Sequence, residues 1–126
     1  MKRSALGILA ILGILLATAA VARADAVRCR GELGGRTIAG TLVVPDGALC
    51  TVRDTVVTGD VLVGHGAGLR LRDGAAIRGN LRADDCDYVS FEPLTPAARI
   101  SVAGSVEIAH CREASGKLFS GGRVTV

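Results

Sequence analysis

The sequence is poor in aromatic residues: its 126 residues include no tryptophan, one tyrosine and two phenylalanines. Flat rings that stack on sugars or on nucleic-acid bases are therefore scarce. The short motifs of several common active sites are also missing, since there is no Gly-x-Ser-x-Gly, no phosphate-binding loop and no His-Glu-x-x-His. These absences favour a non-catalytic protein.

The chain without its first 24 residues also has no excess of basic charge. Residues 1–24 have the features of a signal peptide: a basic start, an uncharged apolar run over 5–22 and the small-x-small cleavage site Ala22-Arg23-Ala24. We expect a mature chain of 102 residues, the 126 less the leader's 24, beginning at Asp25. Cleavage removes three of the fifteen basic residues and none of the twelve acidic ones, so the net formal charge falls from +3 to zero. A neutral chain lacks the basic surface that nucleic-acid binding requires.

The leader leaves one alternative open. An apolar run of ~18 residues is about long enough to span a bilayer, so the leader would act as an anchor if it were not cleaved. No second apolar run of this length follows it. We expect cleavage, a secreted or periplasmic protein, and no membrane span in the mature chain.

A pentapeptide of the form Gly-x-aliphatic-x-aliphatic, with alanine once in the last place, occurs five times. Its glycines are separated by 19, 20, 25 and 18 residues. A period near twenty, built on a unit that alternates every second residue, is typical of a stacked β-coil in which each repeat forms one turn, or rung. The copies are 40–44, 59–63, 79–83, 104–108 and 122–126.

Apolar residues hold the same phase outside the pentapeptide as well, which predicts that they line up in interior columns when the rungs stack. An antiparallel barrel or sandwich of short strands is the alternative. We expect an all-β single domain, a parallel β-helix of about five short rungs over 37–126, with residues 25–36 as an N-terminal segment tied to the coil. The columns are Leu42/Val61/Leu81/Val106/Val124, Val44/Val63/Ala83/Ile108/Val126, Cys50/Leu69/Val89, Val52/Leu71/Phe91 and Ile38/Val57/Ile77/Val102, the last ending at Ser120.

The glycine that opens each repeat suggests a sharp corner, because glycine adopts backbone angles closed to other residues. The longest spacing contains Glu92-Pro93-Leu94-Thr95-Pro96. We interpret this segment as a loop at one corner, where solenoids accept insertions.

On this pattern the sequence resembles the right-handed parallel β-helix repeats of secreted bacterial proteins. The copies Gly59-Asp60-Val61-Leu62-Val63 and Gly79-Asn80-Leu81-Arg82-Ala83 also resemble the rungs of bactofilins, a family of polymer-forming bacterial β-helices that are mainly intracellular. The resemblance covers about residues 37–126 and implies a right-handed coil rather than an activity. This chain differs from bactofilins in having a secretory leader and four cysteines.

The four cysteines, Cys29, Cys50, Cys86 and Cys111, favour disulfides in an exported chain. Cys86 and Cys111 each lie seven residues after a repeat glycine, and Cys29 precedes Cys50 by 21 residues, about one rung. Stacked strands lie about 4.8 Å apart, within the roughly 4.4–6.8 Å between Cα atoms that a disulfide needs. We predict the pairs Cys29–Cys50 and Cys86–Cys111. A metal site or a redox-active thiol pair is the alternative, disfavoured because the chain contains no C-x-x-C.

Two acidic features allow a functional interpretation. Asp84-Asp85-Cys86-Asp87 would suit Ca²⁺, although a solvated corner explains it as well. Arg53-Asp54 and Arg72-Asp73 share one phase, which predicts a charge ladder on the surface; the alternative is a paired-carboxylate glycosidase or lyase site.

The two histidines, His65 and His110, are far apart in rung position, so no Ser–His–acid arrangement is indicated. We assign no catalytic residue, no metal and no cofactor.

We therefore expect a non-catalytic structural or binding module of the bacterial cell envelope, whose partner is an envelope protein or a glycan. A small carbohydrate-active enzyme is one alternative. Self-assembly through the coil ends is another, because the fifth pentapeptide ends at Val126 within a strand whose free edge invites strand addition.

Overall fold

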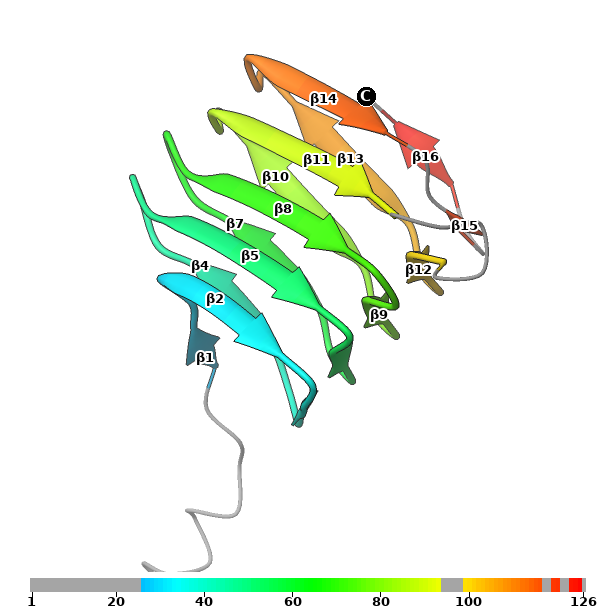
Figure 1. Ribbon diagram of the computed structural model, residues 1–126. Helices are drawn as coiled ribbons and strands as arrows, with labels where there is room; N and C mark the ends of the chain where they lie inside the picture. The colour runs from blue at the N-terminus through cyan, green and yellow to red at the C-terminus, as the bar shows by residue number, and fades with distance from the viewer. Residues whose placement is uncertain (1–25, 94–98, 117–118, 121–122, 126) are drawn as a thin grey trace, which may run out of the picture.

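The computed structural model describes residues 26–93, 99–116, 119–120 and 123–125 (Figure 1). The expected signal peptide (1–24), most of the loop expected at 92–96, and both Gly122 and Val126 lie outside the described residues. In the described ranges all regular structure is β-strand, and no helix is long and apolar enough to cross a membrane. The expected all-β fold is confirmed.

The strands form three sheets, which we call A, B and C. Sheet A has the order β1 (Val27–Arg28), β4 (Leu42–Val44), β7 (Val61–Val63), β10 (Leu81–Asp84), β13 (Val106–Ala109), β16 (Val124–Thr125). Sheet B has the order β2 (Gly31–Gly34), β5 (Leu49–Arg53), β8 (Gly68–Arg72), β11 (Tyr88–Glu92), β14 (Glu113–Gly116). Sheet C has the order β3 (Thr37–Ile38), β6 (Val56–Val57), β9 (Ala76–Ile77), β12 (Ser101–Val102), β15 (Phe119–Ser120).

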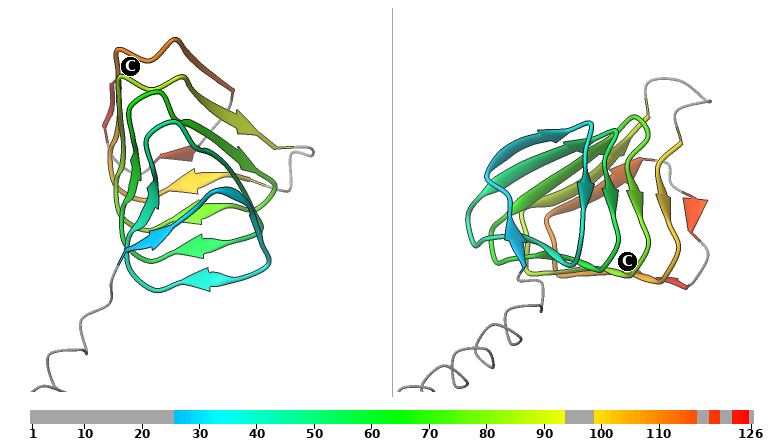
Figure 2. Two further views of the ribbon diagram at one scale, coloured as in Figure 1. Left: turned by 90° about the vertical axis from the view of Figure 1, so that its left-hand side faces the viewer. Right: turned by 90° about the horizontal axis from the view of Figure 1, so that it is seen from below.

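The chain visits the three sheets in turn, so each rung adds one strand to every sheet. The views in Figure 2 show successive rungs following one another along the stack. All strand pairs of the described residues are parallel. This pairing excludes the antiparallel barrel or sandwich for this part of the chain.

The interior columns are those that the repeat phase predicts. In sheet A, Val61 pairs with Leu42 on one side and Leu81 on the other, and all three side chains are fully buried. The matching series in sheets B and C are also in register. Between the buried positions of sheet A, Leu62, Arg82 and Glu107 point outward, so each strand has one dry face.

The N-terminal segment is part of the sheets. Residues 25–36 were expected to form a segment tied to the coil, and the described residues of this range contribute β1 to sheet A and β2 to sheet B. Val27 pairs with Leu42, which places it in the first interior column. The segment has no pentapeptide, because Asp25 stands where the later repeats have glycine.

The repeat glycines are required by close packing more than by corner geometry. Gly40 has a positive φ of 113°, whereas Gly59, Gly79 and Gly104 are not among the positive-φ residues. These three stack directly: the N–H of Gly59 donates to the Gly40 carbonyl at 2.9 Å, and Gly79 and Gly104 continue the series. A Cβ on Gly79 would lie 2.6 Å from the carbonyl oxygen of Gly59. No other amino acid fits such a column without moving backbone.

The residue after each glycine adds a second ladder. The Asp60 carboxylate accepts a hydrogen bond from the N–H of Asn80 at 2.8 Å, and the Asn80 side-chain oxygen accepts one from the N–H of Ser105 at 2.9 Å. Aspartate and asparagine thus accept the same backbone hydrogen bond in neighbouring rungs, because both side chains have an oxygen that can accept it.

Candidate functional site

Two parts of the surface gather polar side chains from several rungs. The first is the outer face of sheet B, where β8, β11 and β14 lie side by side. The second is the corner that follows sheet A, which holds His65 and the acidic segment 84–87. In both places the rung register brings together residues that are about twenty positions apart in the sequence.

Tyr88, the single tyrosine of the chain, lies on the outer face of sheet B. Its neighbours Val89 and Phe91 point into the core, and across the ladder it pairs with Gly68 of β8. The ring covers that glycine, since a Cβ on Gly68 would lie 2.6 Å from Cζ of Tyr88. Glycine at this position therefore lets the ring rest against the sheet.

Three polar side chains surround the ring. The Arg70 guanidinium carbon lies 5.9 Å from the Tyr88 ring centroid, within cation–π range. The Nε of Arg70 lies 3.0 Å from Oε2 of Glu92, an ion-pair contact in which Nε makes no hydrogen bond, and the Ser90 hydroxyl donates to the same carboxylate oxygen. These contacts hold the polar groups in place beside the ring.

A hollow of about 260 Å³ opens over this group. Its walls contain one guanidinium, two carboxylates, one phenol and two hydroxyls. They belong to Arg70, Tyr88, Ser90, Glu92, Glu113 and Ser115. We call this set the sheet B hollow.

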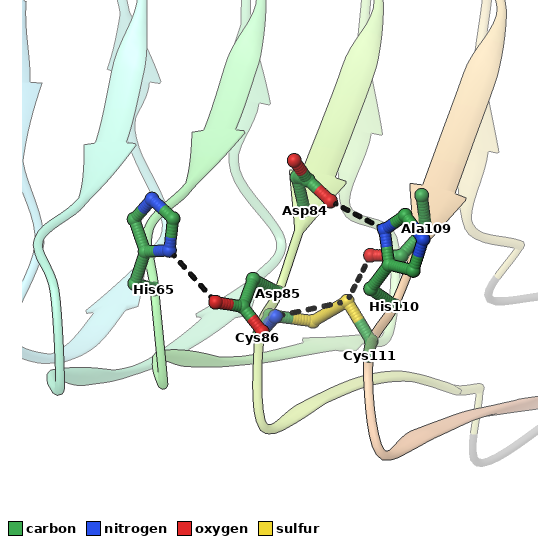
Figure 3. Close-up of a disulfide and its surroundings, with 7 residues drawn as sticks. All are labelled: His65, Asp84, Asp85, Cys86, Ala109, His110 and Cys111. Carbon is green, nitrogen blue, oxygen red and sulfur yellow. Dashed lines mark hydrogen bonds and ion pairs between the residues drawn. A yellow bond between two sulfur atoms is a disulfide. The ribbon is translucent and has the colours of Figure 1, made fainter.

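The corner after sheet A corrects one sequence-based interpretation. His65 and His110 were described as far apart in rung position, but both stand six residues after a repeat glycine, as do Asp46 and Asp85. They occupy one column of the corner, two rungs apart. Nδ1 of His65 lies 3.0 Å from Oδ2 of Asp85 in the rung between them, as Figure 3 shows.

The carboxylates of the acidic segment 84–87 contact basic side chains of neighbouring rungs. Asp84 Oδ1 lies 3.1 Å from Nδ1 of His110, and Asp87 Oδ1 lies 3.3 Å from a guanidinium nitrogen of Arg112. Among the described residues, no group of three or more His, Cys, Asp or Glu side chains is arranged to hold a metal ion. The carboxylates of Asp84 and Asp87 thus contact basic side chains rather than one another.

Two residues of the expected charge ladder contact neighbouring rungs. Arg53 pairs with Glu32 of the preceding rung at 3.1 Å. Asp54 is one of the non-glycine residues with positive φ, at 48°, and its N–H donates to the Asp73 carbonyl at 2.7 Å. Asp54 therefore shapes a turn between sheets B and C, and the half-exposed ion pair contributes at most about 1 kcal/mol.

Contacts with aspartates control the charge of His65. The hydrogen bond to Asp85, the negative charge of Asp46 and that of Asp85 together raise the pKa of His65 above its ordinary value of 6.5. A raised pKa in the folded state means that protonation stabilises the fold. This contribution is fully present below the unfolded pKa and is lost as pH rises through the folded pKa.

We therefore expect the denaturation midpoint of the protein to fall as pH rises from about 6 to about 8, near the titration range of histidine. His65→Gln, which keeps a polar side chain but cannot take up the proton, should flatten this slope. Urea denaturation at several pH values measures both. An equal slope in the variant and the natural protein would show that the Asp85 contact does not control this titration.

Two disulfides link neighbouring rungs. The structure pairs Cys29 with Cys50 and Cys86 with Cys111, with Cα–Cα distances of 5.6 and 4.5 Å. These are the pairs predicted from the spacing. Disulfides are typical of proteins in an oxidising compartment, extracellular or periplasmic.

The sequence contained signals for some of these features and not for others. The His–Asp column can be read from the spacing, since its members share one distance from the glycine. The Tyr88–Gly68 contact could not be read in this way, because it depends on which strands pair. Comparison with protein-family models, with curated proteins and with solved structures found no match for this chain.

Proposed function

We propose that this chain is an exported, right-handed parallel β-helix that serves as a non-catalytic binding module of the bacterial cell envelope. Residues 1–24 act as a cleaved signal peptide, and the sheet B hollow binds a glycan. The position of the single tyrosine carries this proposal. The two disulfides support export, because they persist in oxidising compartments.

The sheet B hollow has the chemistry that sugar recognition needs. A sugar ring has apolar C–H faces and a rim of hydroxyls, so it binds where an aromatic ring adjoins fixed donors and acceptors. Tyr88 offers the ring, and Arg70 and Glu92 offer a donor and an acceptor beside it. Leu49, which is 55% exposed and pairs with Gly68 across the ladder, extends the apolar surface by one rung.

The charge of the hollow selects among glycans. Its walls hold the carboxylates of Glu92 and Glu113 against the one guanidinium of Arg70. An acidic polysaccharide would bring a third negative charge, which like-charge repulsion opposes. Neutral or amino sugars are the class that fits.

The contacts of Glu92 favour binding over catalysis. Its carboxylate is engaged within the protein by an ion pair with Arg70 and a hydrogen bond from the Ser90 hydroxyl. A glycosidase needs one carboxyl group that keeps its proton as general acid. The binding experiment therefore also checks whether the protein cleaves the glycan.

The test uses the oxidised mature protein, residues 25–126, on an array of neutral, amino and acidic glycans. Tyr88→Leu keeps an apolar side chain over Gly68 and removes the ring, whereas Tyr88→Phe keeps the ring. We expect neutral or amino glycans to bind, about a ten-fold weaker Kd for Tyr88→Leu, equivalent to about 1.4 kcal/mol, and a near-natural Kd for Tyr88→Phe.

Two results would contradict the proposal. Equal binding by Tyr88→Leu and Tyr88→Phe would show that the tyrosine ring is not part of the binding site. Binding of acidic glycans alone would show that the two carboxylates of the hollow do not determine which glycans bind. Release of shortened glycan by the natural protein would replace the binding module with the carbohydrate-active alternative.

A second candidate function is end-to-end self-association, for which the C-terminal end of the stack gives a specific observation. Val124 of β16 is 49% exposed, and it borders an apolar hollow of about 150 Å³ together with Phe91, Val106 and Ile108. Within the described residues β1 and β16 are the two edges of sheet A. A second copy that placed its β1 beside β16 would continue the parallel ladder.

This candidate predicts concentration-dependent association of the mature protein, weakened by Val124→Lys, which puts a charge into the contact. Sedimentation velocity over a wide concentration range measures it. Thr125→Lys on the outward position of the same strand is the matched control and should associate like the natural protein. A strict monomer at every concentration would reject self-association and leave the monomeric binding module as the remaining proposal.

A further inference from the structure

The four disulfide-bonded cysteines differ in exposure to solvent. Cys29, Cys50 and Cys86 are buried, with exposed fractions of 2%, 1% and 3%. Cys111 is only partly buried and packs at the margin of the core. A thiol in solution therefore reaches one disulfide of the protein more easily than the other.

The Cys86–Cys111 bridge also lies beside an open hollow of about 430 Å³, which it borders through Cys86. Gly66 borders it from the preceding rung, and a Cβ on Gly66 would meet no atom within 4 Å. Figure 3 shows the bridge between Asp85 and His110 at the corner. The residues around the hollow are Gly66, Asp85, Cys86, Asp87, His110 and Arg112.

The carboxylates at this corner are paired with basic side chains, which reduces their repulsion of an incoming thiolate. Asp85 lies 3.0 Å from His65, and Asp87 lies 3.3 Å from Arg112, so each carboxylate on the hollow has a cationic or titratable partner. The N–H of Cys86 donates to Sγ of Cys111 at 3.3 Å.

We propose that Cys111 is a modification site, at which a small thiol of about tripeptide size exchanges with the Cys86–Cys111 disulfide. The thiolate attacks Sγ of Cys111, a new S–S bond forms, and the Cys111–Cys86 bond breaks with its electron pair leaving on Cys86. The Cys86 thiolate then takes a proton from water. One disulfide is exchanged for another, so no external oxidant or reductant is consumed.

This exchange would loosen one end of the stack. The bridge closes a loop of sequence separation 25 that carries β11, β12 and β13. All four residues of β14, which follows it, are exposed, so without the bridge this strand would be held mainly by its ladder with β11. The site is separate from the sheet B hollow, and the inference does not depend on glycan binding.

The experiment treats the oxidised mature protein with reduced glutathione, quenches with acid at set times and maps the products by mass spectrometry. We expect one glutathione on Cys111, a free thiol on Cys86 and an intact Cys29–Cys50 bridge, with the exposed bridge reacting at least about ten-fold faster, because exchange depends on access to the sulfur. Equal rates for the two bridges, glutathione on Cys86, or no adduct before the protein unfolds would each overturn the inference.

A matched pair of variants tests the hollow itself. Gly66→Asn keeps a residue that tolerates the positive φ of 66° and places a side chain at the rim of the hollow. Gly47 holds the same place one rung earlier, with φ of 72° and equally open surroundings, but it does not border the hollow. We expect Gly66→Asn to slow adduct formation several-fold and Gly47→Asn to leave it unchanged. Equal rates in the two variants would reject approach through the hollow.

Discussion

Val61→Asp is expected to abolish the folded state. Val61 is fully buried between Leu42 and Leu81 in the first interior column, with no polar side chain in that column to receive a carboxylate. An isolated buried charge costs several kcal/mol or more, against about 5–15 kcal/mol for the total stability of a typical domain. Circular dichroism and the loss of a cooperative thermal transition measure the effect.

The neighbouring change Asp60→Asn is the matched control. Asp60 points away from the core, and its carboxylate oxygen accepts a hydrogen bond from the N–H of Asn80. An asparagine already makes the same contact one rung later, toward Ser105. The variant should melt within a few degrees of the natural protein. If both variants melted at the same temperature, the assignment of inward and outward positions would be wrong.

Gly79→Ala is expected to have the second-largest effect. The added methyl would lie 2.6 Å from the carbonyl oxygen of Gly59, and both atoms belong to the stacked glycine column. Relief requires the rungs to separate, which would weaken the hydrogen bonds on both sides of Gly79. We expect a loss of about 2–3 kcal/mol, the usual cost of overpacking. Thermal unfolding should show a fall in Tm of roughly 10–20 °C for a domain of this size.

Gly34→Ala is the control for this prediction. Gly34 lies at the end of β2 with an ordinary backbone conformation, and its added methyl would meet the flexible Arg53 side chain at 3.4 Å. The cost should stay below about 1 kcal/mol. If Gly34→Ala lowered the Tm as much as Gly79→Ala, the glycine column would have no special role in the stack.

The columns were predictable because two simple regularities act together. A strand with one buried face alternates every second residue, and a coil repeats that alternation at every rung. Once the glycines fixed the phase, Leu42, Val61 and Leu81 had to face inward together. The same phase placed Cys86 beside Cys111, since both stand seven residues after a glycine.

The remaining features depend on three-dimensional contacts that the sequence pattern does not specify. The first rung lacks the glycine signal, so β1 and β2 could not be recognised from the pentapeptide. The role of Gly79 was attributed to a corner, whereas the structure shows that its lack of a side chain matters because another carbonyl lies against it. The Tyr88 ring over Gly68 requires the parallel register of β8 and β11, which the period alone leaves open.

The claim that the sheet B hollow is the ligand-binding surface is tested most directly by NMR. Amide shifts of the isotope-labelled mature protein are followed during titration with a neutral or amino glycan selected from the array. We expect the largest shifts on the amides of Gly68–Arg72 in β8 and Tyr88–Glu92 in β11, which carry the hollow. Shifts concentrated at the His65–His110 corner or around Val124, with none on these two strands, would contradict it.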